Sequence, residues 1–530
     1  MRNFIRANWP IILIVILGIF FRFWRIDQLP GGLFPDEAAN GLDVNAILNG
    51  DIQPFYERGN GREALFFYFL AISVALFGRG PWQHHIISAG FGLLAVVATY
   101  FLTKRMFGKR VALLASFFMA VSSYAVTISR TAFRANAVPL LSILTLYFLI
   151  CFFSARGGQT QEQKKKYWYA ALSGLSFALG FYTYISFRML LPLLFVFAII
   201  LIYSQRHRIK KLIQEYWAYK LAFAAAFLAG FGWLGYYFLT HPGTFVGRAG
   251  QVSIFSPALN NGSILETFIE VFKATMLSFF TVGDLNWRHN VAGYPFLSVF
   301  ISPFFAFALI LCTWAIFRLL KNAWERKLNE TTTYQSLTAV WFYFMLIPEI
   351  TTAEGIPHGL RLIGVIPPIF ILSAWGVDWF WQKISAYSRL PYTRSLIAFV
   401  FLFSIFIYNY YAYFAVAAAS SDYYYAFRSD LTTVSNYLIQ RNQKTKTYLA
   451  LDKFSVQTVD YLTTEKSQPY VLLVPENTYQ VQLEKGDQVI FTQSSLIDSN
   501  KFEQYHPRAK LIKVEQNKFK EVIMLLYEQL

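Results

Sequence analysis

Acidic side chains are scarce in this sequence. Among its 530 residues, 30 aspartates and glutamates stand against 47 lysines and arginines, and charged residues make up only 15% of the chain. Hydrophobic residues make up 55% and aromatic residues 19%, which excludes an ordinary soluble domain. Because the apolar residues come in long blocks, the composition indicates a polytopic membrane protein.

Cysteine is nearly absent as well. Cys151 and Cys312 both lie inside apolar runs, so the sequence predicts neither a disulfide nor a cysteine-ligated metal. No Asp-x-Asp pair or second acidic cluster is present, and the C-terminal part lacks a phosphate-binding glycine loop. The net charge of +17 lies in short clusters between apolar blocks, which is typical of topology signals and excludes a nucleic-acid-binding face.

The apolar blocks have the length of membrane spans, about 20 residues each. The first block has the basic start of a secretory signal but no small-residue cleavage pattern after it, so we expect it to remain as an uncleaved span. Eleven spanning helices are predicted near residues 9–26, 82–102, 111–129, 137–154, 168–186, 189–204, 221–239, 295–317, 336–352, 361–381 and 395–414.

One further apolar stretch, "ALFFYFLAISVALFG" from Ala64 to Gly78, is ambiguous because it has only 15 residues. Short loops rich in lysine and arginine stay in the cytoplasm. With eleven spans the basic clusters fall on that side, whereas a twelfth span at 64–78 would place most of them outside. We therefore predict that this stretch lies in the membrane interface or dips into the membrane.

This topology places the N-terminus in the cytoplasm and the segment after residue 415 outside the cell membrane. In that segment the apolar blocks stop, and alternating patches such as "TYLALD", "YVLLVP", "QVIFTQ" and "KLIKVEQ" predict strands. The stretches "DLTTVSNYLIQRNQ" and "FSVQTVDYLTTE" predict helices between them. We expect a transmembrane domain over 1–415 and a small external α/β domain over 416–530.

The stretch "FPDEAANGLDVNAILNG" gathers acids in the first external loop. Pro35 with Asp36 and Glu37 predicts a helix start, and Gly50 predicts its end. Asp36, Asn40 and Asp43 then lie at i, i+4 and i+7 on one face. In one interpretation Asp36 only caps a surface helix; in the other, the acidic face does chemistry.

Arginines collect on the same external side, which the topology rule normally depletes of positive charge. Anionic phosphate at the membrane surface is one physical reason, because a guanidinium matches phosphate oxygens in a bidentate fork. Pairing to lipid headgroups or to loop carboxylates is the alternative for each of them. The basic residues concerned are Arg62, Arg130, Arg134, Arg188, Arg248, Arg288, Arg361, His289 and His358.

An acid beside arginines at the outer boundary suits group transfer from a lipid phosphate. The carboxylate deprotonates an acceptor hydroxyl, and the arginines neutralise the departing phosphate. A single Asp-Glu pair is weak support for a metal, so we expect no cofactor, although a divalent ion is compatible with carboxylates.

These residues resemble a known family. The stretches "FPDEAANGLDVNAILNGD" and "GREALFFYFLAISVALFG" are similar to the first external loop of the GT-C membrane glycosyltransferases, in particular the protein O-mannosyltransferase and aminoarabinose-transferase-like group of bacterial type. The resemblance covers about residues 1–415. It implies a sugar donor carried on a polyprenyl phosphate, with transfer on the non-cytoplasmic side.

The resemblance also implies roles for individual residues. Asp36 matches the family's catalytic acid, implied to be the general base, with Glu37 as its partner, and Arg62 stands where a basic residue contacts the lipid phosphate. In "TISRTAFRANAVPL" the acid that many relatives carry is missing, which puts more weight on Asp36. Candidates for sugar or phosphate contacts are Asp43, Arg130, Arg134, Asp284, Arg288, His289, Glu354, His358 and Arg361.

The leading hypothesis is therefore a metal-independent, inverting glycosyltransferase of the plasma membrane. Its partners are a polyprenyl-phosphate sugar, membrane lipids, and a protein, lipid or glycan acceptor that the sequence leaves open. A transporter or flippase for lipid-linked sugars is the alternative, but it predicts mid-span ionisable residues and paired broken segments. A membrane-anchored binding protein is a third interpretation, weakened because most of the chain is apolar.

Overall fold

The structure, a computed structural model, describes residues 2–59, 61–155, 160–245, 252–260, 262–387, 391–441, 445–466 and 469–530. It divides into two compact units, each built from separate stretches of chain. The membrane unit comprises Met1–Trp24, Gln53–Phe66 and Ile87–Ala417. The loop–sheet unit comprises Arg25–Ile52, Phe67–Ile86 and Ala418–Leu530.

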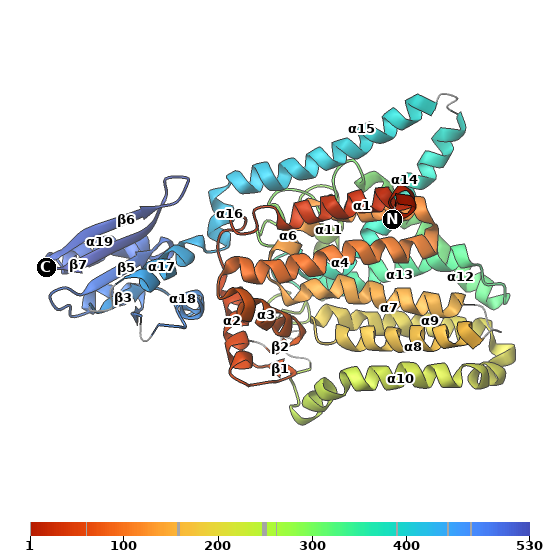
Figure 1. The fold of residues 1–530 in the computed structure, drawn as a ribbon, viewed down its shortest axis with the longest axis horizontal. Coiled ribbons are helices and arrows are strands. Elements are labelled where there is room, and N and C mark those ends of the chain that lie inside the picture. The colour runs from red at the N-terminus through yellow and green to blue at the C-terminus, as the bar shows by residue number, and fades with distance from the viewer. Residues whose placement is uncertain are drawn as a thin grey trace. The chain divides into compact units, whose positions relative to one another are not determined.

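Helices form at each of the eleven predicted span positions. Helix α7 packs on α8 and α8 on α10, and these helices run side by side in Figure 1. The helices are α1 (Arg2–Phe23), α4 (Pro81–Phe107), α5 (Lys109–Val121) with α6 (Ser123–Arg130), α7 (Ala137–Ser154), α8 (Thr160–Gly180), α9 (Leu190–Ser204), α10 (Ile209–Thr240), α12 (Ser302–Trp324), α13 (Glu330–Ile350), α14 (Ile366–Tyr387) and α15 (Pro391–Tyr410).

In the part of the chain that the structure describes, fewer helices than eleven have the length and apolar content of a membrane span. Within the described residues, seven helices are long and apolar enough to cross a membrane, or eight if α5 and α6, bent by 57°, form one span. Helices α8 and α13 begin with polar turns, "TQEQKKK" and "ETTTYQS", which lower their apolar content. Eleven spans therefore stay a prediction.

One predicted span begins within a loop. The span expected from residue 295 begins only at Ser302, as α12. The preceding segment is held as a loop, since the Phe296 amide donates to the Ser278 carbonyl at the end of α11 (Ile264–Ser278). Pro303 then occupies the first turn of α12, where its missing N–H costs nothing.

The ambiguous stretch after the first loop forms a short helix, α3 (Leu65–Phe77), of 13 residues. At 1.5 Å per residue it is about 20 Å long, shorter than the hydrocarbon core of about 30 Å. Its length agrees with the prediction that it does not span, while its placement in the interface stays a prediction.

The C-terminal segment folds around a five-stranded sheet in the order β4-β3-β5-β7-β6 (Figure 1). Strands β3 (Thr447–Ala450), β4 (Val471–Leu473) and β5 (Gln488–Thr492) are parallel. Strand β7 (Val522–Gln529) runs antiparallel to both of its neighbours, β5 and β6 (Ala509–Gln516). The predicted strands and helices are confirmed here, and β7 was not predicted. Apolar side chains of α17 (Ser429–Gln440) and α18 (Val456–Leu462) cover one face of the sheet, and α19 (Leu496–Tyr505) packs on the other.

The acidic loop belongs to this same unit. Its helix α2 (Pro35–Leu48) contacts α18 of the C-terminal segment. The division into 1–415 and 416–530 expected from the sequence groups α2 with the membrane helices. The structure instead packs α2 with the sheet-bearing segment, far away in sequence.

Candidate functional site

The first turn of α2 separates the two acids that the sequence places side by side. Pro35 occupies the first helical turn, where its fixed φ is already helical. Glu37 is 1% exposed, and its Oε2 accepts a hydrogen bond of 2.9 Å from the Phe34 amide. Asp36 is exposed. Glu37 thus caps the helix, and Asp36 is the acid that a reactant can reach from solvent.

Glu37 also has a buried histidine neighbour. Its Oε1 lies 3.3 Å from Nε2 of His85, at the start of α4, and both side chains are almost fully buried. The adjacent His84 is likewise buried and places Nδ1 3.1 Å from the Gly80 carbonyl oxygen. Sequence reasoning missed this pair, although two histidines at the mouth of an apolar span, "PWQHHII", are a functional signal in a membrane protein.

The predicted polar face of α2 does not point uniformly to solvent. Asp36 is exposed, whereas Asn40 and Asp43 are 7% and 3% exposed. The face therefore turns into the protein toward its C-terminal end. Only its first turn presents an acid to solvent.

A cluster of three charged residues lies in the membrane unit. Strand β2 (Arg62–Glu63) pairs with β1 (Phe55–Tyr56) and carries Glu63, which is 3% exposed. Glu63 pairs with Arg188 at 3.0 Å and with Arg134 at 3.5 Å. One carboxylate thus faces two guanidiniums, and the group keeps one positive charge to offer an anion. Sequence reasoning named both arginines but not Glu63, although it directly follows Arg62.

Arg130 binds backbone carbonyl oxygens at the end of α1. Its guanidinium donates to the carbonyl oxygens of Phe21 at 3.1 Å and Trp24 at 2.9 Å, at the end of α1. It also lies 5.3 Å from the centre of the Tyr413 ring. Helix C-terminal carbonyls favour a cation, so these contacts explain the burial of Arg130 without a phosphate.

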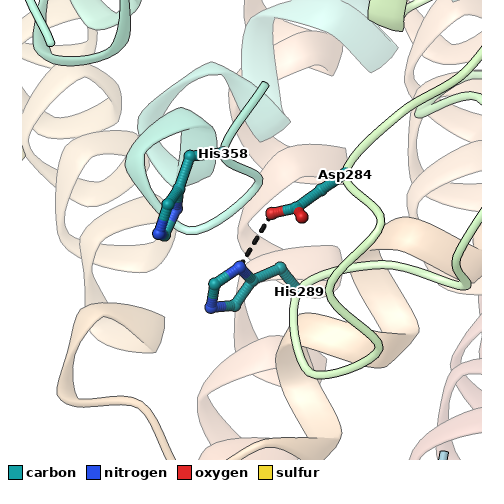
Figure 2. A group of neighbouring side chains, drawn as sticks. All are labelled: Asp284, His289 and His358. Carbon is teal, nitrogen blue, oxygen red and sulfur yellow. Dashed lines mark hydrogen bonds and ion pairs between the residues drawn. The ribbon is translucent and has the colours of Figure 1, made fainter. Parts of the chain in front are cut away.

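Asp284, His289 and His358 come together from two segments of the membrane unit, as Figure 2 shows. Asp284 Oδ2 accepts from Nδ1 of His289 at 2.7 Å and from the Gly359 amide at 2.8 Å. Its Oδ1 accepts from the Asn286 amide at 2.7 Å. Asp284 therefore orients His289 and ties its own loop to the segment after α13.

The same segment holds a second charged group. Glu349, fully buried near the end of α13, accepts from the His358 amide at 2.8 Å and lies 4.0 Å from the Arg361 guanidinium. Glu354 lies 3.8 Å from the same guanidinium. Arg361 thus lies within 4.0 Å of two acids. Glu349 was missed by sequence reasoning, although a lone acid at the end of an apolar run signals a functional or structural charge.

The three residues in Figure 2 also have the composition of a divalent metal site. Each offers one ligand atom, and these atoms lie within 4.8 Å of one another. Imidazole and carboxylate suit zinc. However, both oxygens of Asp284 already accept hydrogen bonds, and the two imidazole rings are tilted by 33° at a centroid distance of 4.3 Å. A metal ligated by all three would have to rearrange these contacts.

Comparison with solved structures identifies the fold. The chain is similar to ArnT from Cupriavidus metallidurans bound to undecaprenyl phosphate, with a TM-score of 0.54 at 12% identity over 98% of both chains. It is also similar to the archaeal oligosaccharyltransferase AglB from Archaeoglobus fulgidus, in complex with an inhibitory peptide and a dolichol-phosphate, with a TM-score of 0.52 at 13% identity over 99% of this chain and 74% of that chain. The chain has a GT-C fold.

The sequence comparison agrees with the fold. Residues 64–233 match the family model described as dolichyl-phosphate-mannose-protein mannosyltransferase. None of the curated proteins matches the chain in sequence. The resemblance to GT-C glycosyltransferases inferred from the first external loop is confirmed, and with it the mostly helical membrane fold.

Within this GT-C fold the predicted site residues fall into separate groups. Asp36, Glu37 and Asp43 lie on α2, in the loop–sheet unit. The others lie in the membrane unit, where Arg62 and Arg288 are partly exposed and Glu354 is exposed. Arg248 lies outside the described residues. The roles of all these residues stay predictions.

The buried His289 predicts a pH effect on stability. Burial lowers the pKa of its imidazole more than the hydrogen bond to Asp284 raises it. As pH falls below about 6.5, the unfolded chain therefore takes up the proton before the folded protein does, and stability is lost. We expect the unfolding temperature in detergent to fall more between pH 7 and pH 5 for the wild type than for His289→Gln. Equal pH dependence of the two proteins would contradict this.

Proposed function

We propose that this GT-C protein is a membrane glycosyltransferase. It moves a sugar from a polyprenyl-phosphate donor to an acceptor hydroxyl on the non-cytoplasmic side of the plasma membrane. The N-terminus is cytoplasmic and the sheet-bearing segment external in this proposal. The single observation that carries it is the fold match along nearly the whole chain to ArnT bound to undecaprenyl phosphate.

The chemistry assigns Asp36 as the general base. The acceptor oxygen attacks the anomeric carbon as Asp36 takes its proton, and the bond from that carbon to the phosphate oxygen breaks. Polyprenyl phosphate leaves with the electron pair, so one step inverts the anomeric configuration. The exposure of Asp36 supports its assignment as the base, because a base must come within hydrogen-bond reach of the acceptor hydroxyl.

Charge on the leaving phosphate is stabilised by arginines of the membrane unit. Arg62 and Arg288 are partly exposed, and the group of Glu63, Arg134 and Arg188 has an excess of one positive charge. Guanidinium forks fit phosphate oxygens, and this match is strongest where water is excluded. His289, His358 and Arg361 complete the proposed contact surface with Asp284 and Glu354.

The test supplies purified protein with labelled polyprenyl-phosphate sugars, with and without a chelator. With water as the acceptor, we expect release of free sugar from at least one donor and of polyprenyl phosphate in equal amount. Because the proposed base and arginines need no metal, the rate should be the same with the chelator. Loss of turnover with the chelator, restored by zinc, would instead assign a metal to the group in Figure 2. Failure with every donor would contradict the transferase proposal.

A further inference from the structure

The C-terminal segment of the loop–sheet unit packs against the helix that carries Asp36. Gly41, in the middle of α2, faces the ring of Tyr461 from α18. A Cβ atom added at Gly41 would lie 2.5 Å from Tyr461 Cε2, a distance that real Cβ contacts do not show. Tyr461 is fully buried. The contact of helix and ring thus depends on the absence of a side chain at position 41.

A second close contact lies just before α2. A Cβ atom added at Gly32 would lie 2.3 Å from the Phe427 carbonyl oxygen and 2.5 Å from the Ser429 amide nitrogen. Both are backbone atoms, which cannot rotate away. The Thr458 hydroxyl also donates to the Leu33 carbonyl oxygen at 3.1 Å. The main chain just before Phe34 is therefore fixed by the C-terminal segment.

The same aromatic residues reach the histidines behind Glu37. The Tyr461 ring meets His84 edge-on at a centroid distance of 5.0 Å, and the Phe427 ring meets His85 at 6.3 Å. His85 in turn lies 3.3 Å from Glu37, which caps α2. At the far end of α2, Asn45 donates to the Thr464 hydroxyl at 3.1 Å. Helix α2 is thus held at its start, middle and end.

We propose that the C-terminal segment is the positioning element of the active site, with the Gly41–Tyr461 contact fixing the helix that presents Asp36. This inference rests on the proposed role of Asp36 as base. Tyr461 is a positioning residue here, because it acts through α2 and does not touch the reacting atoms. A displacement of about 1 Å in a catalytic group costs on the order of 100-fold in rate.

Gly41→Ala tests the contact because alanine by itself stabilises a helix, whereas its clash with Tyr461 should displace α2. Alanine favours a helix over glycine by about 1 kcal/mol, so α2 by itself should gain order. We expect kcat to fall about 100-fold through the Tyr461 clash, with the donor KM unchanged. Gly90→Ala in α4 is the matched control, since its added Cβ meets nothing within 4 Å. A Gly41→Ala enzyme with wild-type kcat would overturn the proposal.

Once the Tyr461 ring is removed, the methyl group added at position 41 should have no further effect on kcat. We expect the double variant Gly41→Ala/Tyr461→Ala to match the kcat of Tyr461→Ala alone, because the added methyl group then has room. Tyr461→Phe should keep wild-type kcat, since the Tyr461 hydroxyl has no hydrogen-bond partner within the described residues. A double variant slower than Tyr461→Ala alone, or a large loss in Tyr461→Phe, would contradict positioning by the ring.

Hydrogen exchange separates this inference from the proposed function. In Gly41→Ala the amides of α2 should lose protection while those of α12 keep it, and the double variant should show the same protection as Tyr461→Ala alone. If exchange behaves in this way but no donor is turned over by the wild type, the function is wrong and the contact stands. If turnover is found but α2 protection is unchanged in Gly41→Ala, the positioning proposal fails.

Discussion

Asp36→Asn is expected to lower kcat by on the order of 10²–10⁴-fold, the usual contribution of a general base. Asparagine keeps the size of the side chain but cannot accept the acceptor's proton. Since Asp36 is exposed and the proposed phosphate contacts lie on other residues, the donor KM should change little. The measurement is release of labelled sugar to water from the best donor at saturating donor concentration.

The control for this variant is Asp51→Asn. Asp51 is another exposed acid just after α2, and removing its charge should leave kcat near the wild-type value. Equal release by Asp36→Asn and wild type would show that Asp36 is not the base. A comparable loss in Asp51→Asn would show that the loop needs its overall charge and not a base at one position.

Glu37 should behave differently from its neighbour. Glu37→Gln keeps an oxygen that accepts from the Phe34 amide but loses the charge beside His85. A cap contributes about 1 kcal/mol, which is about fivefold in an equilibrium. We therefore expect a small loss of kcat in Glu37→Gln and a larger loss of stability in Glu37→Ala. This contrast distinguishes a capping acid from a reacting one.

The sequence predicted the positions of helices and strands well, because each depends on local patterns. Long apolar runs locate α1, α4 to α10 and α12 to α15, and the alternation in "QVIFTQ" locates β5. The packing of α2 against α18 was not predictable, because it joins residues 41 and 461 through a shape match. Nothing in the pattern around Gly41 shows that a tyrosine ring occupies the space of its missing side chain.

The candidate site shows the same limit. The helix start at Pro35 and the two acids could be read directly, but the burial of Glu37 and exposure of Asp36 could not. The distribution of basic clusters along the chain placed these arginines on the external side, but it did not show which acids they contact. Glu63 and Glu349 are single acids in otherwise apolar or basic stretches, and only the tertiary structure shows that each one lies within 4.0 Å of an arginine.

Glu63→Gln is expected to destabilise the membrane unit by about 3–5 kcal/mol, the usual cost of removing one partner from a buried ion pair. Arg134 and Arg188 would then face each other across an uncharged amide. The measurement is the free energy of unfolding in detergent, or the unfolding temperature. Glu215→Gln is the matched control, because its pair with Lys211 is exposed and should contribute less than about 1 kcal/mol.

A loss of stability in Glu63→Gln has two possible causes: repulsion between the guanidiniums of Arg134 and Arg188, or loss of the shape and hydrogen bonds of Glu63. If repulsion between guanidiniums is the cause, Glu63→Gln/Arg134→Gln should be more stable than Glu63→Gln alone, since one of the two cations is gone. Added polyprenyl phosphate should also stabilise Glu63→Gln more than the wild type, because an anion that binds only the folded state replaces the lost carboxylate. A double variant less stable than the single one would show that Glu63 acts through its shape and hydrogen bonds, and that the group does not offer its charge to phosphate.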